Sequence, residues 1–121
     1  MAAGKLDIVL EQGGTFEMSL QVLDDNNAVF DLTGYTAIMK IVDKITNTIV
    51  DVSTVGSVSV SDKVYIKIPD EYTATLESDS NEYAPSIRTK YANRAYEIAI
   101  TKDGDIKKIA RGNAYVVRRI V

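Results

Sequence analysis

The sequence has no cysteine, no histidine and no tryptophan among its 121 residues, and it has only two prolines. Without cysteine the chain forms no disulfide, and without cysteine or histidine it lacks the usual ligands of zinc, haem and iron–sulfur clusters. The same absences remove the serine–histidine and cysteine–histidine pairs of common hydrolases, so only carboxylates, lysines, tyrosines and hydroxyl groups remain for acid–base chemistry. We therefore expect a protein that is not an enzyme and that holds no cofactor or metal.

Long hydrophobic runs are also missing. No segment approaches the roughly 20 apolar residues of a membrane-spanning helix, and the N-terminal stretch lacks the apolar run of a signal peptide. Hydrophobic residues make up 45% and charged residues 26% of the chain, which is typical of a globular domain. A chain of this length encloses one core. We expect residues 1–121 to form a single domain, made in a cytosol-like compartment and without membrane contact.

Alternation of apolar and polar residues with a period of two dominates the sequence, and Thr15–Leu23 shows it most clearly. Tyr35–Val42 is apolar on both faces for much of its length, which predicts an interior strand. Short alternating segments separated by turns are typical of an all-β fold, and we predict an antiparallel β-sandwich, immunoglobulin-like or Greek-key in form. The remaining strands are predicted at Thr48–Ser53, Ser57–Ser61, Val64–Ile68, Tyr96–Thr101, Ile106–Arg111 and Ala114–Val121.

The alternation also predicts which side chains form the core, because one face of each strand must turn inward. Leu32 is expected to close one end of this core, since it lies in a turn immediately before a strand. The predicted core consists of Phe16, Met18, Leu20, Val22, Leu32, Ala37, Met39, Ile41, Ile66, Ile68, Leu76, Ile98 and Ile100.

One segment departs from the period of two. Pro69–Glu77 has a proline at a suitable first helical position and acidic residues in the first turn, which favours a short helix of about two turns. Tyr72 and Leu76 stand four residues apart, so both are expected to face the core. This segment is the one short helix of the predicted sandwich.

Three polar clusters admit a chemical interpretation and a structural one. Asp24–Asn27 has the oxygens of a calcium loop without its spacing, and Asp103 and Asp105 resemble a carboxylate pair around Gly104. Gln12–Thr15 resembles an anion-binding loop, although a strand follows it instead of a helix. Turn formation explains all three, and Asp-Gly is a strong hairpin signal, so we favour turns at each place.

The segment 78–94 has no clear periodicity, and at this length it exceeds an ordinary connecting loop, so we predict a contact loop. Basic and aromatic residues alternate along it, a pattern that also suits single-stranded nucleic acid. The acidic balance of the whole chain, net charge −3, makes nucleic acid an unlikely partner and favours a protein interface. The predicted interface residues are Tyr83, Arg88, Lys90, Tyr91 and Arg94.

Charge is divided unevenly along the chain. Residues 1–87 contain fourteen acidic residues and five lysines, whereas residues 88–121 contain nine basic and three acidic residues. Pairing between neighbouring strands and exposure to solvent are the favoured interpretation. Any asymmetry that remains on the surface would favour contact between identical copies or with an oppositely charged partner.

Two short motifs carry a resemblance to a known family. Gln12–Phe16 and Asp31–Ile41, followed more loosely by Ile66–Ile68, Thr73–Leu76 and Tyr96–Ile100, are similar to the small β-sandwich domain of tailed-bacteriophage structural proteins. These include the N-terminal domain of upper-baseplate proteins that attach receptor-binding or fibre modules.

This resemblance implies a structural protein of the virion, an adaptor or assembly subunit of the tail, baseplate or neck. Its partners would be other virion proteins and copies of itself, with no role for a small molecule. The segment 78–94 departs from the family pattern and no receptor-binding domain follows Val121, so receptor binding is not expected. Two alternatives stay open: a capsid decoration protein and, from a different class, a carbohydrate-binding module, which the absence of tryptophan disfavours. A small hydrolase that uses carboxylates is the least favoured.

Overall fold

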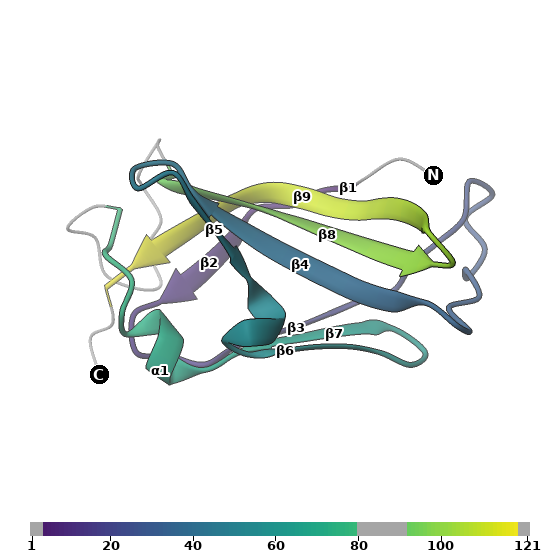
Figure 1. The fold of residues 1–121 in the computed structure, drawn as a ribbon, viewed down its shortest axis with the longest axis horizontal. Helices are drawn as coiled ribbons and strands as arrows, with labels where there is room; N and C mark the ends of the chain where they lie inside the picture. The colour runs from purple at the N-terminus through teal and green to yellow at the C-terminus, as the bar shows by residue number, and fades with distance from the viewer. Residues whose placement is uncertain (1–3, 80–91, 119–121) are drawn as a thin grey trace.

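The computed structural model describes residues 4–79 and 92–118, which form two packed β-sheets (Figure 1). The larger sheet contains β1 (Gly4–Lys5), β2 (Ile8–Glu11), β4 (Thr36–Asp43), β5 (Thr48–Asp51), β8 (Arg94–Lys102) and β9 (Asp105–Val117). The smaller sheet contains β3 (Phe16–Leu20), β6 (Ser57–Val60) and β7 (Val64–Ile68). The predicted all-β sandwich is therefore confirmed.

The order of strands places β4 and β8 in the middle of the larger sheet, as the two-sided apolar pattern of Tyr35–Val42 predicted. The order is β1-β9-β8-β4-β5, with β2 also paired to β9, and the smaller sheet runs β3-β7-β6. The pairs of β1 and β2 with β9 are parallel, whereas the other described strand pairs are antiparallel. Neither N-terminal strand was predicted. Their parallel pairing with β9 differs from the purely antiparallel sheets that we predicted.

The core lies between the two sheets and agrees with the predicted set. Eight of its predicted members are buried, and the other five are partly buried and packed against them. Leu32 is 5% exposed, so it closes the core as expected. The prediction missed Leu10 and Val116, which are buried where the unpredicted β2 pairs with β9.

Strand β9 joins two segments that we predicted as separate strands, Ile106–Arg111 and Ala114–Val121. Gly112 lies in the gap between the two predicted strands, but it stays in the ladder opposite Tyr96 of β8. A Cβ atom at Gly112 would lie 2.1 Å from the carbonyl oxygen of Leu6, so only glycine lets the N-terminal segment approach this closely. The glycine thus marks a close backbone approach and not the end of a strand.

The helix is shorter than predicted. Helix α1 covers Asp70–Thr73, and Pro69 is its N-cap instead of its first helical residue. Thr73 is buried, and its hydroxyl donates a hydrogen bond of 2.8 Å to the carbonyl of Gly14, while the side chain of Gln12 donates to the carbonyl of Leu76. These contacts hold the following turn against the β2–β3 connection. Tyr72 and Leu76 both pack on the core, as their spacing predicted.

The predicted strand Thr48–Ser53 ends early. Asp51 accepts hydrogen bonds from the amide and the hydroxyl of Ser53, and it caps the 3₁₀ helix η1 (Val52–Thr54) that follows β5. Val52 is buried, so η1 covers the core between β5 and β6. The aspartate competes with the strand by bonding its own backbone, which explains the change of structure.

Candidate functional site

Four of the five predicted interface residues, Tyr83, Arg88, Lys90 and Tyr91, lie outside the described residues, as does most of the predicted contact loop. The fifth, Arg94, is the first residue of β8. Its side chain is only 7% exposed, because it shares the inward face of the strand with Tyr96 and Ile98. Our expectation of an exposed loop arginine at this position is therefore wrong.

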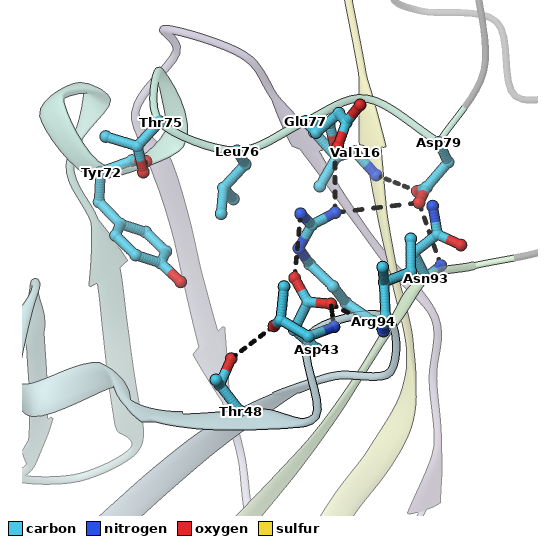
Figure 2. A network of polar contacts seen from close by, with 12 residues as sticks. Asp43, Thr48, Tyr72, Thr75, Leu76, Glu77, Asp79, Asn93, Arg94 and Val116 are labelled. Atoms are coloured by element: carbon cyan, nitrogen blue, oxygen red, sulfur yellow. Dashed lines mark hydrogen bonds and ion pairs between the residues drawn. The ribbon is translucent and has the colours of Figure 1, made fainter.

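The guanidinium of Arg94 lies between two carboxylates from distant parts of the chain (Figure 2). Its Nη2 lies 3.3 Å from Oδ2 of Asp43, the residue that faces Arg94 in the β4–β8 ladder. Its Nη1 lies 3.9 Å from Oδ1 of Asp79 and donates a hydrogen bond of 3.0 Å to the carbonyl of Glu77. The arginine thus joins β4 to the segment that follows α1.

The carboxylate of Asp79 binds two backbone amides, one from the residue before β8 and one from β9. Its side chain is 1% exposed; Oδ1 accepts the amide of Asn93 at 3.0 Å, and Oδ2 accepts the amide of Val116 at 2.6 Å. The amide of Asp79 also donates to the carbonyl of Val116 at 2.9 Å. Asp79 is therefore bound to Asn93, the residue before β8, and to Val116 of β9.

Asp43 completes the cluster at the end of β4. Its Oδ1 accepts hydrogen bonds from the amides of Ile45 and Thr46. The amide of Thr46 is the main cause of the lowered pKa of Asp43, and the amide of Ile45 and the charge of Arg94 lower it further against the opposing effect of burial. Asp43 is consequently ionised at neutral pH and balances the buried arginine.

This cluster has the properties of a structural joint. Its charges face one another and its carboxylates accept backbone amides, and among the described residues no buried side-chain nitrogen or oxygen lacks a hydrogen-bond partner. Within that same part of the chain no group of three acidic or other ligating side chains is arranged to hold a metal ion. The cluster fixes chain segments to one another.

The three polar clusters that we interpreted as turns are turns. Oδ1 of Asp24 accepts the amides of Asn26 and Ala28, as in an ordinary polar turn. Asp103 and Gly104 have φ of 51° and 83°, which suits a tight hairpin of the mirror-image type. The segment Gln12–Thr15 is the connection between β2 and β3.

The outer face of the larger sheet carries a feature that the sequence analysis missed. Residues that face one another across neighbouring strands form a row of charges that crosses five strands, with mostly alternating sign. The cross-strand pairs that define this row run, in order, through Asp51, Lys40, Glu97, Arg111 and Lys5. We call these five residues the charge row.

An apolar row lies beside the charge row. It consists of Ile49, Val42 and Ala95, which face one another on β5, β4 and β8. Ile49 is 66% exposed, and Ile45 in the adjoining β4–β5 turn is 68% exposed. An open depression of about 580 Å³ is lined by both rows, including Lys5, Lys40, Val42, Ile49 and Arg111. No described element covers this face, which we call the sheet platform.

The electrostatics of the platform are local. The pKa of Asp51 is lowered, mainly by its hydrogen bonds from Ser53, and the charge of Lys40 adds to this effect. Glu97 forms an ion pair of 3.2 Å with Lys108 on β9, beside the charge row. Alternating residues signal such a face, but only the register of β4, β8 and β9 brings the charges into one row, and the sequence does not disclose the register.

Comparison with known proteins adds no family. No protein-family model matches the sequence, and no curated protein is detectably similar to it. In the described parts of the chain, no helix has the length and apolar character needed to cross a lipid bilayer. Any function must therefore be argued from the surfaces themselves.

Proposed function

We propose that this chain is an assembly subunit that works by binding other protein chains, and that its setting is the tail, baseplate or neck of a tailed-bacteriophage virion. The observation that carries the proposal is the sheet platform, where exposed Ile49 and half-buried Val42 adjoin the charge row. Apolar area supplies binding free energy, and charges of both signs select the partner and fix its register.

The phage setting is supported by the motifs that resemble the tail-protein sandwich. Gln12–Phe16 spans the connection into β3, and Asp31–Ile41 spans the turn into β4. Oδ1 of Asp31 accepts the amide and the hydroxyl of Thr33, and Gly34 follows with φ of 82°. These residues shape the entry to the central strands, and no part of the motif points to chemistry. A role in assembly without catalysis agrees with that composition.

A capsid decoration protein would use the same kind of surface, so the position in the particle separates it from a tail protein. A carbohydrate-binding module is less favoured. Such modules stack sugars on exposed aromatic rings, and among the described residues the large exposed hydrophobic side chains include a single aromatic, Tyr65. Its hydroxyl donates to Asp62 at 2.8 Å.

The setting is tested on virions purified by density from a host that carries this gene. We expect the chain to be present in purified particles in a fixed ratio to the known tail proteins, measured by quantitative mass spectrometry. Gold-labelled antibody should mark the tail or baseplate. Labelling of the capsid shell would support the decoration alternative, and absence of the chain from intact particles would overturn the proposal.

The surface is tested by reversing one charge. Lys40→Glu places three acidic residues in succession across the charge row, and we expect it to reduce incorporation into particles severalfold, because repulsion at the platform disfavours docking. Lys63→Glu, in the turn between β6 and β7, makes the same change of charge on the other sheet and serves as the control. Equal incorporation of both variants, each with an unchanged circular dichroism spectrum, would exclude the platform as the docking surface.

A further inference from the structure

The smaller sheet is open along β3. The inward side chains of β7, Val64, Ile66 and Ile68, are at most 2% exposed. Those of β3, which are Phe16, Met18 and Leu20, are only partly buried although they pack against the same core. The difference arises because β7 has a strand on each side and β3 has one on a single side. A further strand beside β3 would cover all three.

Monomeric proteins protect such an edge with proline, with inward-facing charge, with a bulge or with a covering element. Strand β3 has none of the first three: its sequence is FEMSL, its one charge, Glu17, points outward, and its pairing with β7 is regular. Within residues 4–79 and 92–118, β7 is the only strand that pairs with it. Within the described parts of the chain, the outer edge of β3 is therefore unpaired and can accept another strand.

The opposite edge of the same sheet differs. Strand β6 contacts both β4 and η1, so its own connection to β5 packs against it. A Cβ atom at Gly56, just before β6, would lie 2.2 Å from the carbonyl oxygen of Lys67, which shows how closely this connection lies against β7. The connection from β5 thus packs against the β6 side of the smaller sheet.

We propose that β3 pairs with β3 of a second copy of this chain, antiparallel, about a two-fold axis at Met18. This inference rests on the proposed function of an assembly subunit present in several copies. The pairing would convert two three-stranded sheets into one continuous sheet and place Phe16, Met18 and Leu20 of both copies side by side.

The second copy fits because the strand is complementary to itself. In a continuous sheet, inward-facing residues of one copy must lie opposite inward-facing residues of the other. A two-fold axis perpendicular to the sheet meets this condition when it passes beside one residue of β3, and moving the axis to the next residue shifts the pairing by two positions. The register centred on Met18 pairs Phe16 with Leu20 and Glu17 with Ser19, and it uses the whole strand. Centring on Glu17 would place two carboxylates directly opposite each other, which is unfavourable.

The interface is small. A pairing of five residues from each chain buries less than the roughly 1,200 Å² typical of a stable complex, so we expect a reversible dimer that is reinforced when many copies assemble. Self-association should therefore depend on protein concentration, and sedimentation velocity or native mass spectrometry over a concentration series measures it.

The register predicts effects of opposite sign at one position. Ser19→Lys places a lysine opposite Glu17 of the second copy, twice per dimer, and should tighten the dimer roughly threefold to tenfold. Ser19→Glu places like charges opposite each other and should weaken it by a similar factor. Ser19 is exposed, so neither change is expected to disturb the fold.

Ser59 provides a matched control. Ser19 and Ser59 are both exposed serines, and both face Tyr65, from opposite sides of β7. Ser59→Lys and Ser59→Glu should leave the dimer constant unchanged. A wild type that stays monomeric at all concentrations, or a dimer that responds equally at both serines, would overturn the proposed pairing.

A cross-link tests the two-fold axis directly. Since the chain has no cysteine, Met18→Cys introduces a single thiol that should oxidise to a covalent dimer, because opposite residues in an antiparallel pair lie within disulfide reach. Val58→Cys is the control, since Val58 faces Ile66 from the β6 side as Met18 does from the β3 side. Equal cross-linking of both variants would contradict the model of β3 pairing.

These outcomes are separable from the proposed function. If the Ser19 variants leave self-association unchanged while Lys40→Glu still blocks incorporation into virions, the edge pairing fails and the assembly role stands. If the dimer forms as described but the chain is absent from virions, the phage setting fails and the self-pairing stands.

Discussion

At one end of β8, Arg94 is buried between two carboxylates, whereas at the other end Lys102 is exposed beside a hairpin turn. Arg94 contacts two separate segments of the chain, the end of β4 at Asp43 and the segment after α1 at Glu77 and Asp79. Lys102 is exposed, donates to the carbonyl of Thr33 at 3.3 Å and lies 5.5 Å from the centre of the half-buried Tyr35 ring. The two cations occupy the same strand and have opposite surroundings.

From this comparison we expect burial to determine how much each charged side chain contributes to the free energy of unfolding. Removing one member of a buried pair leaves the other charge without solvent, while exposed pairs contribute little because water replaces the lost partner. The Arg94 end should therefore stabilise the fold, and the Lys102 end should be tolerant of change and available for contacts.

The largest effect is expected for Arg94→Ala, which leaves Asp79 and Asp43 without their cation. We expect the free energy of unfolding to fall by about 3–5 kcal/mol. Lys102→Ala is the control, and its loss should stay below about 1 kcal/mol. Urea unfolding followed by circular dichroism measures both, since the chain has no tryptophan.

Losses of equal size at both ends would contradict the comparison. If Arg94→Ala does not fold, Arg94→Lys keeps the charge and loses the planar fork of the guanidinium. A loss smaller than that of Arg94→Ala, yet larger than that of Lys102→Ala, is then the expected result.

An intermediate effect is expected from acid. The pKa of Asp43 is lowered from its ordinary value of 3.8, mainly by the amide of Thr46. A carboxyl group whose pKa is lower in the folded state stabilises the fold above its unfolded pKa, and this contribution is lost as the pH falls through the folded value. We therefore expect the free energy of unfolding to decline below about pH 3.8, and to decline less steeply in Asp43→Asn.

Asp31, whose carboxyl group feels the charge of Lys102, allows the acid experiment to be repeated at the other end of β8. Its pKa is also lowered, chiefly by the Thr33 hydroxyl, but no buried cation accompanies it. Asp31→Asn should reduce the pH slope and weaken the fold at neutral pH only slightly, whereas Asp43→Asn should also leave the buried Arg94 without one of its carboxylates and weaken the fold more. Identical stability of the two variants at pH 7 would remove the distinction between the ends.

The smallest effect is expected for Ile106→Thr, beside the β8–β9 turn. Ile106 is 63% exposed, so the free energy of unfolding should change by no more than about 0.5 kcal/mol. Thermal unfolding measures it. A loss above about 1 kcal/mol would show that this end carries more of the fold than its exposure indicates.

Local pattern predicted most of the fold. Period-two alternation located β3, β4, β6, β7 and β8, and the Asp-Gly pair located the hairpin, because these signals are confined to neighbouring residues. The exceptions depend on distant contacts. Gly112 lies in the gap between two predicted strands, and the close approach of the Leu6 backbone explains why a glycine stands inside one continuous strand. The short strands β1 and β2 form because β9 offers an edge, which their own residues do not announce.

The candidate site could be predicted less well. Arg94 occupies an inward position of β8, and extending the alternation of Tyr96 and Ile98 by two residues would have indicated its burial. The charge row could not have been found in this way. Its members come from five strands, and they form a row only in the register that the folded sheets adopt.

Strand β9 also sets the order in which the molecule can form. It occupies residues 105–117 and lies between β8 and the strands β1 and β2, which begin at residue 4. During synthesis the first strands must therefore wait until residues 105–117 have left the ribosome before they gain their neighbour. Contacts so distant in sequence slow folding, and the apolar faces of the earlier strands stay accessible to chaperones, or to other nascent copies, in the interval.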